Sequence, residues 1–151
     1  MTDFDLIAKG MTQAVPFAGH LNLEVVEISE GEATVVLPDL PHLKNHVGSQ
    51  HAGALFTAAE TASGAAFVGA FAERMGELTP LARSAEIAYE KIADGRITAK
   101  ARLGVPVAQA LGTLDADGKV EFPCDIELTD AAGTLVATAN VRWHVRLKDR
   151  P

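Results

Sequence analysis

The chain has 151 residues, of which 48% are hydrophobic, so it is long and apolar enough to build one domain with a core of its own. Its formal net charge is −7. That charge argues against a protein that binds a nucleic-acid backbone, because such proteins carry a basic face. A single cysteine excludes an internal disulfide and zinc sites with paired cysteines. We expect one domain over residues 1–151.

The N-terminal segment predicts a short amphipathic helix. Phe4, Ile7, Ala8 and Met11 recur at helical spacing. Two aspartates stand near the start and no long apolar region follows them, unlike a secretory signal peptide. We therefore expect a cytoplasmic protein.

Residues 52–72 predict one long buried helix. The stretch AGALFTAAETASGAAFVGAFA carries a single charge, Glu60. As a helix it would be about 31 Å long, which is enough to cross a bilayer. Small residues dominate it, however, and an ionised carboxylate near its middle is costly in lipid, so we expect no membrane. A helix that is apolar on all sides must be covered on all sides.

Most of the remaining chain predicts strands, because apolar residues alternate with polar ones. The predicted strands are 21–28, 32–37, 84–92, 96–103, 120–128 and 134–147. Residues 105–118 predict a short helix or a loop closed by Asp117-Gly118. Pro123 suggests an edge or a bulge in its strand, and Cys124 falls on the apolar phase, so we expect it to be buried.

These elements predict an α+β fold in which a strongly curved, mostly antiparallel sheet wraps around one central helix. The sheet cannot cover every side of that helix. We expect a partner chain to bury the rest, which predicts a homodimer or a dimer of dimers.

The run NHVGSQHAGALFTAAE, residues 45–60, places a carboxylate downstream of a polar loop. We expect the helix to begin near His51, where free amides and the helix dipole attract negative charge. Glu60 follows nine residues later. If His51 is helical, the two side chains point to opposite sides and lie about 13.5 Å apart along the axis. A two-fold dimer could bring the helix start of one chain to Glu60 of the other.

The same run resembles the signature of hotdog-fold acyl-CoA thioesterases. Members of the phenylacetate-pathway and 4-hydroxybenzoyl-CoA type, and a related uncharacterised branch, show N-x-x-G-[ST]-x-H-G-G and then Asp or Glu nine residues after the His. The resemblance covers roughly residues 15–147. It implies a hotdog fold and hydrolysis of acyl-CoA thioesters, with no cofactor.

The resemblance also assigns roles to the catalytic positions. Glu60 would be the nucleophile or general base, and Asn45 would hold the thioester or the attacking water. His51 would orient the loop at the helix start, and the amide of Ala52 would form the oxyanion hole. Asn45 and His51 would come from one chain of the dimer and Glu60 from its partner.

Gly48, Gly53 and Ser84 would line the substrate site. Gly53 would allow close packing, and Ser84 is the nearest match to a water-positioning Ser or Thr of the family. The usual HGG is HAG here, and an amide donor survives that change only if Ala52 has a negative φ.

Other interpretations stay open for the same residues. Glu60 could be a structural carboxylate, His51 only a helix cap, Asn45 only a turn residue and Ser84 only the start of a strand. His42, His46, His51 and Glu60 offer metal ligands, but their spacing fits no familiar zinc motif, so we expect no metal. The alternative function is a non-catalytic hotdog module that binds an acyl or aromatic ligand; a dehydratase ranks lower.

The acyl group and the site of the CoA phosphates are not set by the motif. Small helix residues such as Ala58, Ala59, Ala62 and Gly64 could leave room for an acyl chain or ring. The phosphates need cations, and we expect them from the polar phase of neighbouring strands. The candidates are Arg83, Arg96, Lys100 and Arg102.

Overall fold

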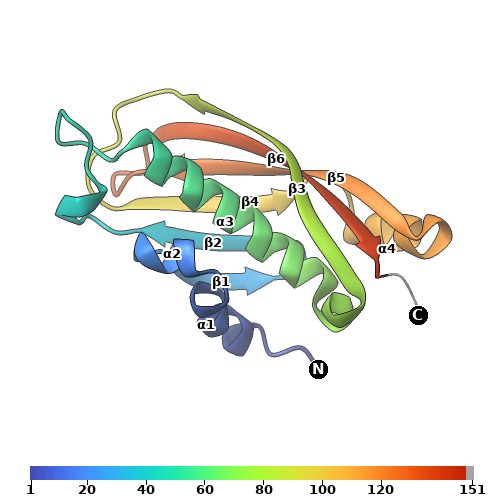
Figure 1. Cartoon of the computed structure of the whole chain (residues 1–151). Coiled ribbons are helices and arrows are strands. Elements are labelled where there is room, and N and C mark those ends of the chain that lie inside the picture. Colours follow the sequence, from blue (N-terminus) through green and yellow to red (C-terminus); the bar gives the residue numbers. More distant parts are fainter. Residues whose placement is uncertain (149–151) are drawn as a thin grey trace.

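The computed structural model of the chain describes residues 1–148, which form a curved sheet around one long helix (Figure 1). The α-helices are α1 Phe4–Ala14, α2 Pro16–His20, α3 Ala52–Phe71 and α4 Val107–Asp117, with 3₁₀ turns η1 Pro41–Leu43 and η2 Ala72–Glu77. The strands are β1 Glu24–Ser29, β2 Glu32–Leu37, β3 Leu78–Tyr89, β4 Ile97–Leu103, β5 Lys119–Thr129 and β6 Leu135–Leu147. Every pairing is antiparallel, in the order β1-β2-β4-β5-β6-β3. The predicted α+β architecture is confirmed.

Helix α3 is the centre of the core. Its composition would allow a membrane span, with a mean hydropathy of 1.2 over 18 residues, but 78% of that window is buried inside the fold. Gly53 and Thr57 keep some exposure near the start of the helix. The other residues that keep some exposure recur every four positions and form one stripe: Ala52, Phe56, Glu60, Gly64 and Val68. A single chain therefore covers most of α3 and leaves this stripe, with Glu60 at its middle, only partly covered.

Aromatic stacking and one hydroxyl set how α3 lies against the sheet. Phe67 stacks on Trp143 of β6 and on Phe122 of β5, with ring centroids 5.7 and 6.2 Å apart. The indole of Trp143 donates a hydrogen bond to the Ser63 hydroxyl, 3.1 Å away. At Gly69 an added Cβ would lie 2.0 Å from the carbonyl oxygen of Ser29, so the helix approaches β1 closely there.

The two edges of the sheet differ. Helix α1 packs against β1 at one edge, and its side-chain cap from Asp3 accepts a hydrogen bond from the Leu6 amide at 3.0 Å. Strand β3 forms the other edge (Figure 1). Most of its residues are exposed, including Leu81 at 58% and Tyr89 at 49%. An apolar edge strand of this length is a ready surface for pairing with another chain.

The helix predicted near the N-terminus and most strands agree with the structure to within three residues, and the segment 105–118 is a helix closed by Gly118 at φ 73°. Strand β3 begins at Leu78, six residues before the predicted start. The prediction missed its first half because burial does not alternate there. Helix α2 was not predicted at all; five residues are too few for a helical period to show.

Pro123 was predicted to mark an edge or a bulge, and β5 is neither an edge strand nor irregular at that residue. The pairing of β5 with β4 stops at Cys124, so the missing N–H of Pro123 breaks no ladder on that side. The Pro123 carbonyl still accepts a hydrogen bond from Gly104 N, 2.7 Å away.

Cys124 is buried as predicted, and burial raises the pKa of its thiol to about 12. A thiol that is neither ionised nor accessible does not react with disulfide reagents. We expect the native protein not to react with a thiol-specific aromatic disulfide. After unfolding in guanidinium, one thiol per chain should react. The variant Ala131→Cys, with a cysteine on an exposed turn, is the control; a native Cys124 that reacts as fast as this control would contradict the prediction.

Candidate functional site

Asn45 organises the loop that leads into α3. Its side-chain oxygen accepts hydrogen bonds from the amides of Val47 and Ser49, both at 3.0 Å. Its amide nitrogen donates to the Ser49 hydroxyl at 2.8 Å and to the Gln50 carbonyl at 3.4 Å. Gly48 completes the turn with φ 84°, a conformation that favours glycine. All the polar atoms of the Asn45 side chain thus serve the loop here, and its contact with substrate or water stays a prediction.

Gln50 holds this loop against the loop that follows β3. Its side chain is 2% exposed and donates to the carbonyls of Pro38 and Gly95, 2.9 and 2.7 Å away. Its backbone amide donates to the carbonyl of Ala93 at 2.8 Å. Sequence reasoning gave Gln50 no role. Its burial beside an exposed histidine could be inferred only from the fold.

The start of α3 carries one free amide. His51 is the N-cap, and its Nδ1 accepts a hydrogen bond from Gly53 N at 2.8 Å, so its proton lies on Nε2. An added Cβ on Gly53 would lie 3.0 Å from that Nδ1, which explains the glycine. Among residues 1–148, no acceptor is paired with the Ala52 N–H. Ala52 is helical, with negative φ, so Ala in place of the usual Gly leaves the amide direction intact.

Tyr89, at the end of β3, contacts the same turn. Its hydroxyl donates to the Ala52 carbonyl oxygen at 3.0 Å. Burial raises the pKa of this phenol, so it stays a donor. The bond ties the edge strand to the residue that carries the free amide. Sequence analysis had placed Tyr89 only in a strand, because a contact over 37 residues leaves no sequence signal.

Glu60 lies in the middle of the exposed stripe of α3. Burial raises the pKa of its carboxyl above the ordinary value of 4.5, and no charged or hydrogen-bonding group of residues 1–148 offsets this shift. Its backbone carbonyl accepts a hydrogen bond from the Ser63 hydroxyl at 2.7 Å. Since Ser63 also accepts from Trp143, this turn of the helix is held to the sheet while the carboxylate faces outward.

Ala52 and Glu60 cannot act on one atom within a single chain. His51 is outside the helix, so the half-turn predicted between His51 and Glu60 does not apply. From Ala52, eight residues rotate the side chain by a net 80° or so and advance it by about 12 Å. The two groups therefore share a face of the helix but lie too far apart along its axis.

Ser84 lies on β3 at a register shift between Ala82 and Ser84, paired with Arg142. Strand β3 runs back along α3 (Figure 1). Ser84 is five residues before Tyr89, or roughly 16 Å along the strand, a level similar to that of Glu60. It is exposed on the open edge, and its part in a substrate site stays a prediction.

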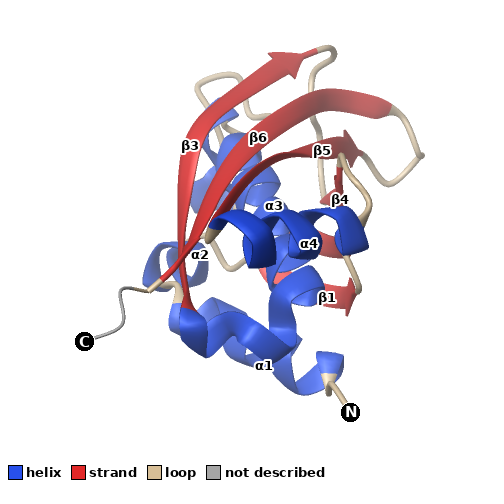
Figure 2. Cartoon of the chain, turned by 90° about the vertical axis from the view of Figure 1, so that its right-hand side faces the viewer, coloured by secondary structure: helices blue, strands red, loops and turns tan. Residues whose placement is uncertain are grey.

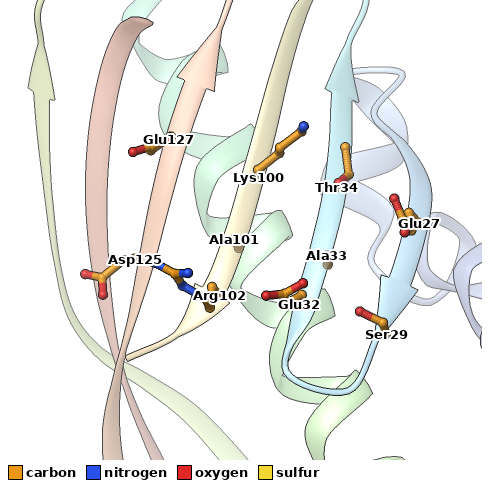
Figure 3. A pocket seen from close by; sticks show the side chains of 10 residues that line it. All are labelled: Glu27, Ser29, Glu32, Ala33, Thr34, Lys100, Ala101, Arg102, Asp125 and Glu127. Atoms are coloured by element: carbon orange, nitrogen blue, oxygen red, sulfur yellow. The ribbon is translucent and has the colours of Figure 1, made fainter. Parts of the chain in front are cut away.

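Three of the four basic residues expected to hold CoA phosphates lie elsewhere or are already paired, whereas Arg96 is exposed on the loop after β3 and its part in phosphate binding stays a prediction. Lys100 and Arg102 alternate with buried residues of β4, so they project from the face of the sheet opposite α3. There they line a hollow of about 360 Å³ that also contains carboxylates of β1, β2 and β5 (Figure 3). Arg83 forms an ion pair with Glu121. The structure gives no support for a phosphate site at these three residues.

The alanines expected to leave room for an acyl group do not line a space either. Ala58, Ala59 and Ala62 are at most 1% exposed and belong to the core. In the described part of the chain, no group of three or more His, Cys, Asp or Glu side chains is arranged to hold a metal ion.

Several solved structures share this architecture. PA5026 of Pseudomonas aeruginosa, described as a protein of unknown function and probable thioesterase, is 26% identical, with a TM-score of 0.87 and 97% of each chain covered. The PaaI protein from the phenylacetic acid degradation operon of E. coli is 20% identical (TM-score 0.69; 95% of this chain and 99% of that one). A variant of the thioesterase enzyme SAV0944 from Staphylococcus aureus is 18% identical (TM-score 0.72; 87% and 99%).

These neighbours establish the hotdog fold for the chain. No curated protein matches its sequence. The domain of unknown function DUF4442 matches residues 5–145, nearly the whole chain. The protein therefore belongs to the DUF4442 family and has a hotdog fold similar to those of thioesterases.

Proposed function

We propose that the protein hydrolyses acyl-CoA thioesters at two equivalent sites of a homodimer. The observation that carries the proposal is the pair formed by the free Ala52 amide at a helix start and the half-buried carboxylate of Glu60, which has no partner among residues 1–148. An amide at the positive end of a helix dipole stabilises a developing oxyanion. A desolvated carboxylate is a stronger base or nucleophile than one in water. Acyl transfer needs both groups.

The reaction follows from these two groups. The thioester carbonyl oxygen accepts from Ala52 N–H of one chain. Glu60 of the other chain either takes a proton from water as that water attacks the carbonyl carbon, or attacks it directly to give an anhydride that water then opens. The C–S bond breaks, the thiol leaves with a proton, and the acid is released. One water is consumed for each thioester.

A second copy of the chain would supply what each site lacks. The separation of about 12 Å between Ala52 and Glu60 along α3 disappears if two helices lie antiparallel. The open edge of β3 and the stripe of α3 are the two surfaces that residues 1–148 leave uncovered beside these groups. Pairing of two β3 edges would continue the sheet and bury Leu81 and its neighbours.

The dimer can be tested at β3. We expect wild-type protein to elute with a light-scattering mass of twice 15.9 kDa, or a multiple of that. The double variant Leu81→Lys, Ala85→Lys places like charges on both paired edges. It should be an inactive monomer. Leu6→Lys, an equally exposed leucine on α1, should change neither mass nor turnover. A monomer that retains full activity would contradict the shared site.

The role of Glu60 can be tested by Glu60→Gln, which keeps the size of the side chain and removes its basicity. A positioned base contributes about 10²–10⁴-fold in rate, so we expect kcat, measured as CoA release, to fall at least about a hundredfold while the dimer persists. Glu60→Asp should be milder. The control is Glu27→Gln, an exposed carboxylate on the outer face of the sheet. Near-wild-type turnover in the Gln variant would exclude Glu60 as the catalytic carboxylate.

The raised pKa of Glu60 predicts a pH dependence of stability. Because the pKa is higher in the folded chain, protonation favours folding. That contribution is complete below the unfolded value, near 4.5, and is lost as pH rises through the folded pKa. We expect the melting temperature of wild type to drop below that of Glu60→Gln as pH is raised from 4.5 towards neutrality. A constant difference between the two across this range would mean that the carboxyl is not desolvated.

The alternative, a binding module without activity, makes a different prediction for the wild-type protein. A panel of acyl-CoAs would raise its melting temperature without releasing CoA, and Glu60→Gln would leave that shift unchanged.

A further inference from the structure

We propose that a groove between α2 and the start of α3 binds the acyl group of the thioester, and that this group is a compact aliphatic or aryl chain. The proposal rests on the function proposed above. The groove has a volume of about 400 Å³ and is lined by α2, the η1 turn and the first turns of α3.

The groove adjoins the proposed oxyanion donor. His51 and Gly53, which flank Ala52, both line it. The Ala52 carbonyl is bonded on the other side by Tyr89 of β3. A thioester has two arms, the acyl group and CoA. When its carbonyl oxygen accepts from Ala52 N–H, these arms extend in opposite directions from the carbonyl carbon. One arm can enter the groove on the α2 side, and the other faces β3.

The volume of the groove is large enough for only part of the thioester. Ligand pockets for drug-sized molecules run from roughly 300 to 1,000 Å³, and 400 Å³ is near the lower end. A whole CoA ester is larger than such a ligand. The groove therefore suits one arm of the substrate.

The side chains that line the groove indicate which arm of the thioester it binds. Leu43 and Ala54, 4% and 5% exposed, form an apolar floor, and Phe17 forms a wall that is 64% exposed. Lys44 is the only Lys or Arg in the lining and already pairs with Asp39. The phosphates of CoA would need several free cations or an arginine, which this lining does not offer. An apolar acyl or aryl group matches the floor and the wall.

The exposure of Phe17 supports a ligand-binding role. A phenylalanine on a five-residue helix, turned towards a hollow instead of into the core, leaves a large apolar surface in water. Because Phe17 lines the same hollow as Leu43 and Ala54, its ring extends an apolar surface that an acyl group would cover. The lining adds hydrogen-bonding groups from His20 and His42, which can accommodate a polar substituent on the acyl group.

Two variants change the groove in opposite directions. Thr57→Phe narrows it from α3, and Phe17→Ala removes its wall. Matched controls are Thr113→Phe, a half-buried threonine on α4, and Leu6→Ala, an exposed apolar residue on α1; neither lines the groove. Melting temperatures establish that each variant is folded. Since Phe17 is largely exposed, its variant remains informative even if Thr57→Phe fails to fold.

The readout is kcat/KM over acetyl-, butyryl-, hexanoyl-, octanoyl- and benzoyl-CoA. One methylene in an apolar pocket can change kcat/KM about tenfold or more. We expect Thr57→Phe to lower kcat/KM at least tenfold for octanoyl- and benzoyl-CoA and less than about twofold for acetyl-CoA. Phe17→Ala should lower it for benzoyl-CoA more than for acetyl-CoA. Both controls should keep the wild-type profile.

Failure of this inference is distinguishable from failure of the proposed function. If wild type hydrolyses acyl-CoAs and Glu60→Gln does not, but both groove variants keep the wild-type profile, the acyl group binds elsewhere and the inference is overturned. If wild type hydrolyses none, calorimetric titration with S-octyl-CoA, a thioether that cannot be cleaved, tests the groove alone. Weaker binding to both variants than to the controls would support it, and equal or no binding would overturn it.

Discussion

The fold depends on covering a helix that has almost no polar face. Helix α3 carries thirteen buried residues over twenty positions, and a curved sheet supplies most of the cover that they need. One sheet of six antiparallel strands arches over it (Figure 2). What the sheet leaves uncovered is a stripe of every fourth residue and, near the helix start, Gly53 and Thr57. The arrangement that buries the helix therefore leaves Glu60, the one charged residue of α3, partly exposed.

The chemistry of the candidate site arises from the start of that helix. A loop shaped by Asn45 and held by Gln50 delivers the chain to His51, whose imidazole caps the Gly53 amide. One first-turn amide, that of Ala52, is left free in the described residues. Helix starts commonly bind anions for this reason. Here Tyr89 adds a bond from the edge strand to the same residue, so the helix start and β3 form one unit.

The site is incomplete within one chain, and this incompleteness connects the assembly to the proposed activity. The Ala52 amide and the Glu60 carboxylate lie about two turns apart on α3. The apolar residues of β3 and the stripe of α3 adjoin both groups. A two-fold axis past this surface would satisfy packing and catalysis together, because each helix start would meet the carboxylate of the other chain.

The sequence by itself determined the elements and the motif. The single charge in 52–72 and its many apolar residues predicted one buried helix, and alternation over 96–103, 120–128 and 134–147 predicted strands that the structure contains. Local patterns of this kind depend on which residues meet the core. Glu60 stood out as the one charge of that helix, and the resemblance of residues 45–60 led to the thioesterase proposal.

Only the tertiary structure decided what depends on contacts between distant segments. Tyr89 reaches Ala52 across 37 residues, and Trp143 reaches Ser63 across 80. The groove beside α2 needs three elements whose lining residues extend from Phe17 to Thr57. The outward direction of Lys100 and Arg102, and the full burial of Ala58 and Ala62, follow from which face of each element the sheet covers. A sequence pattern shows that a strand or helix has two different faces. Packing decides which of these faces meets a ligand.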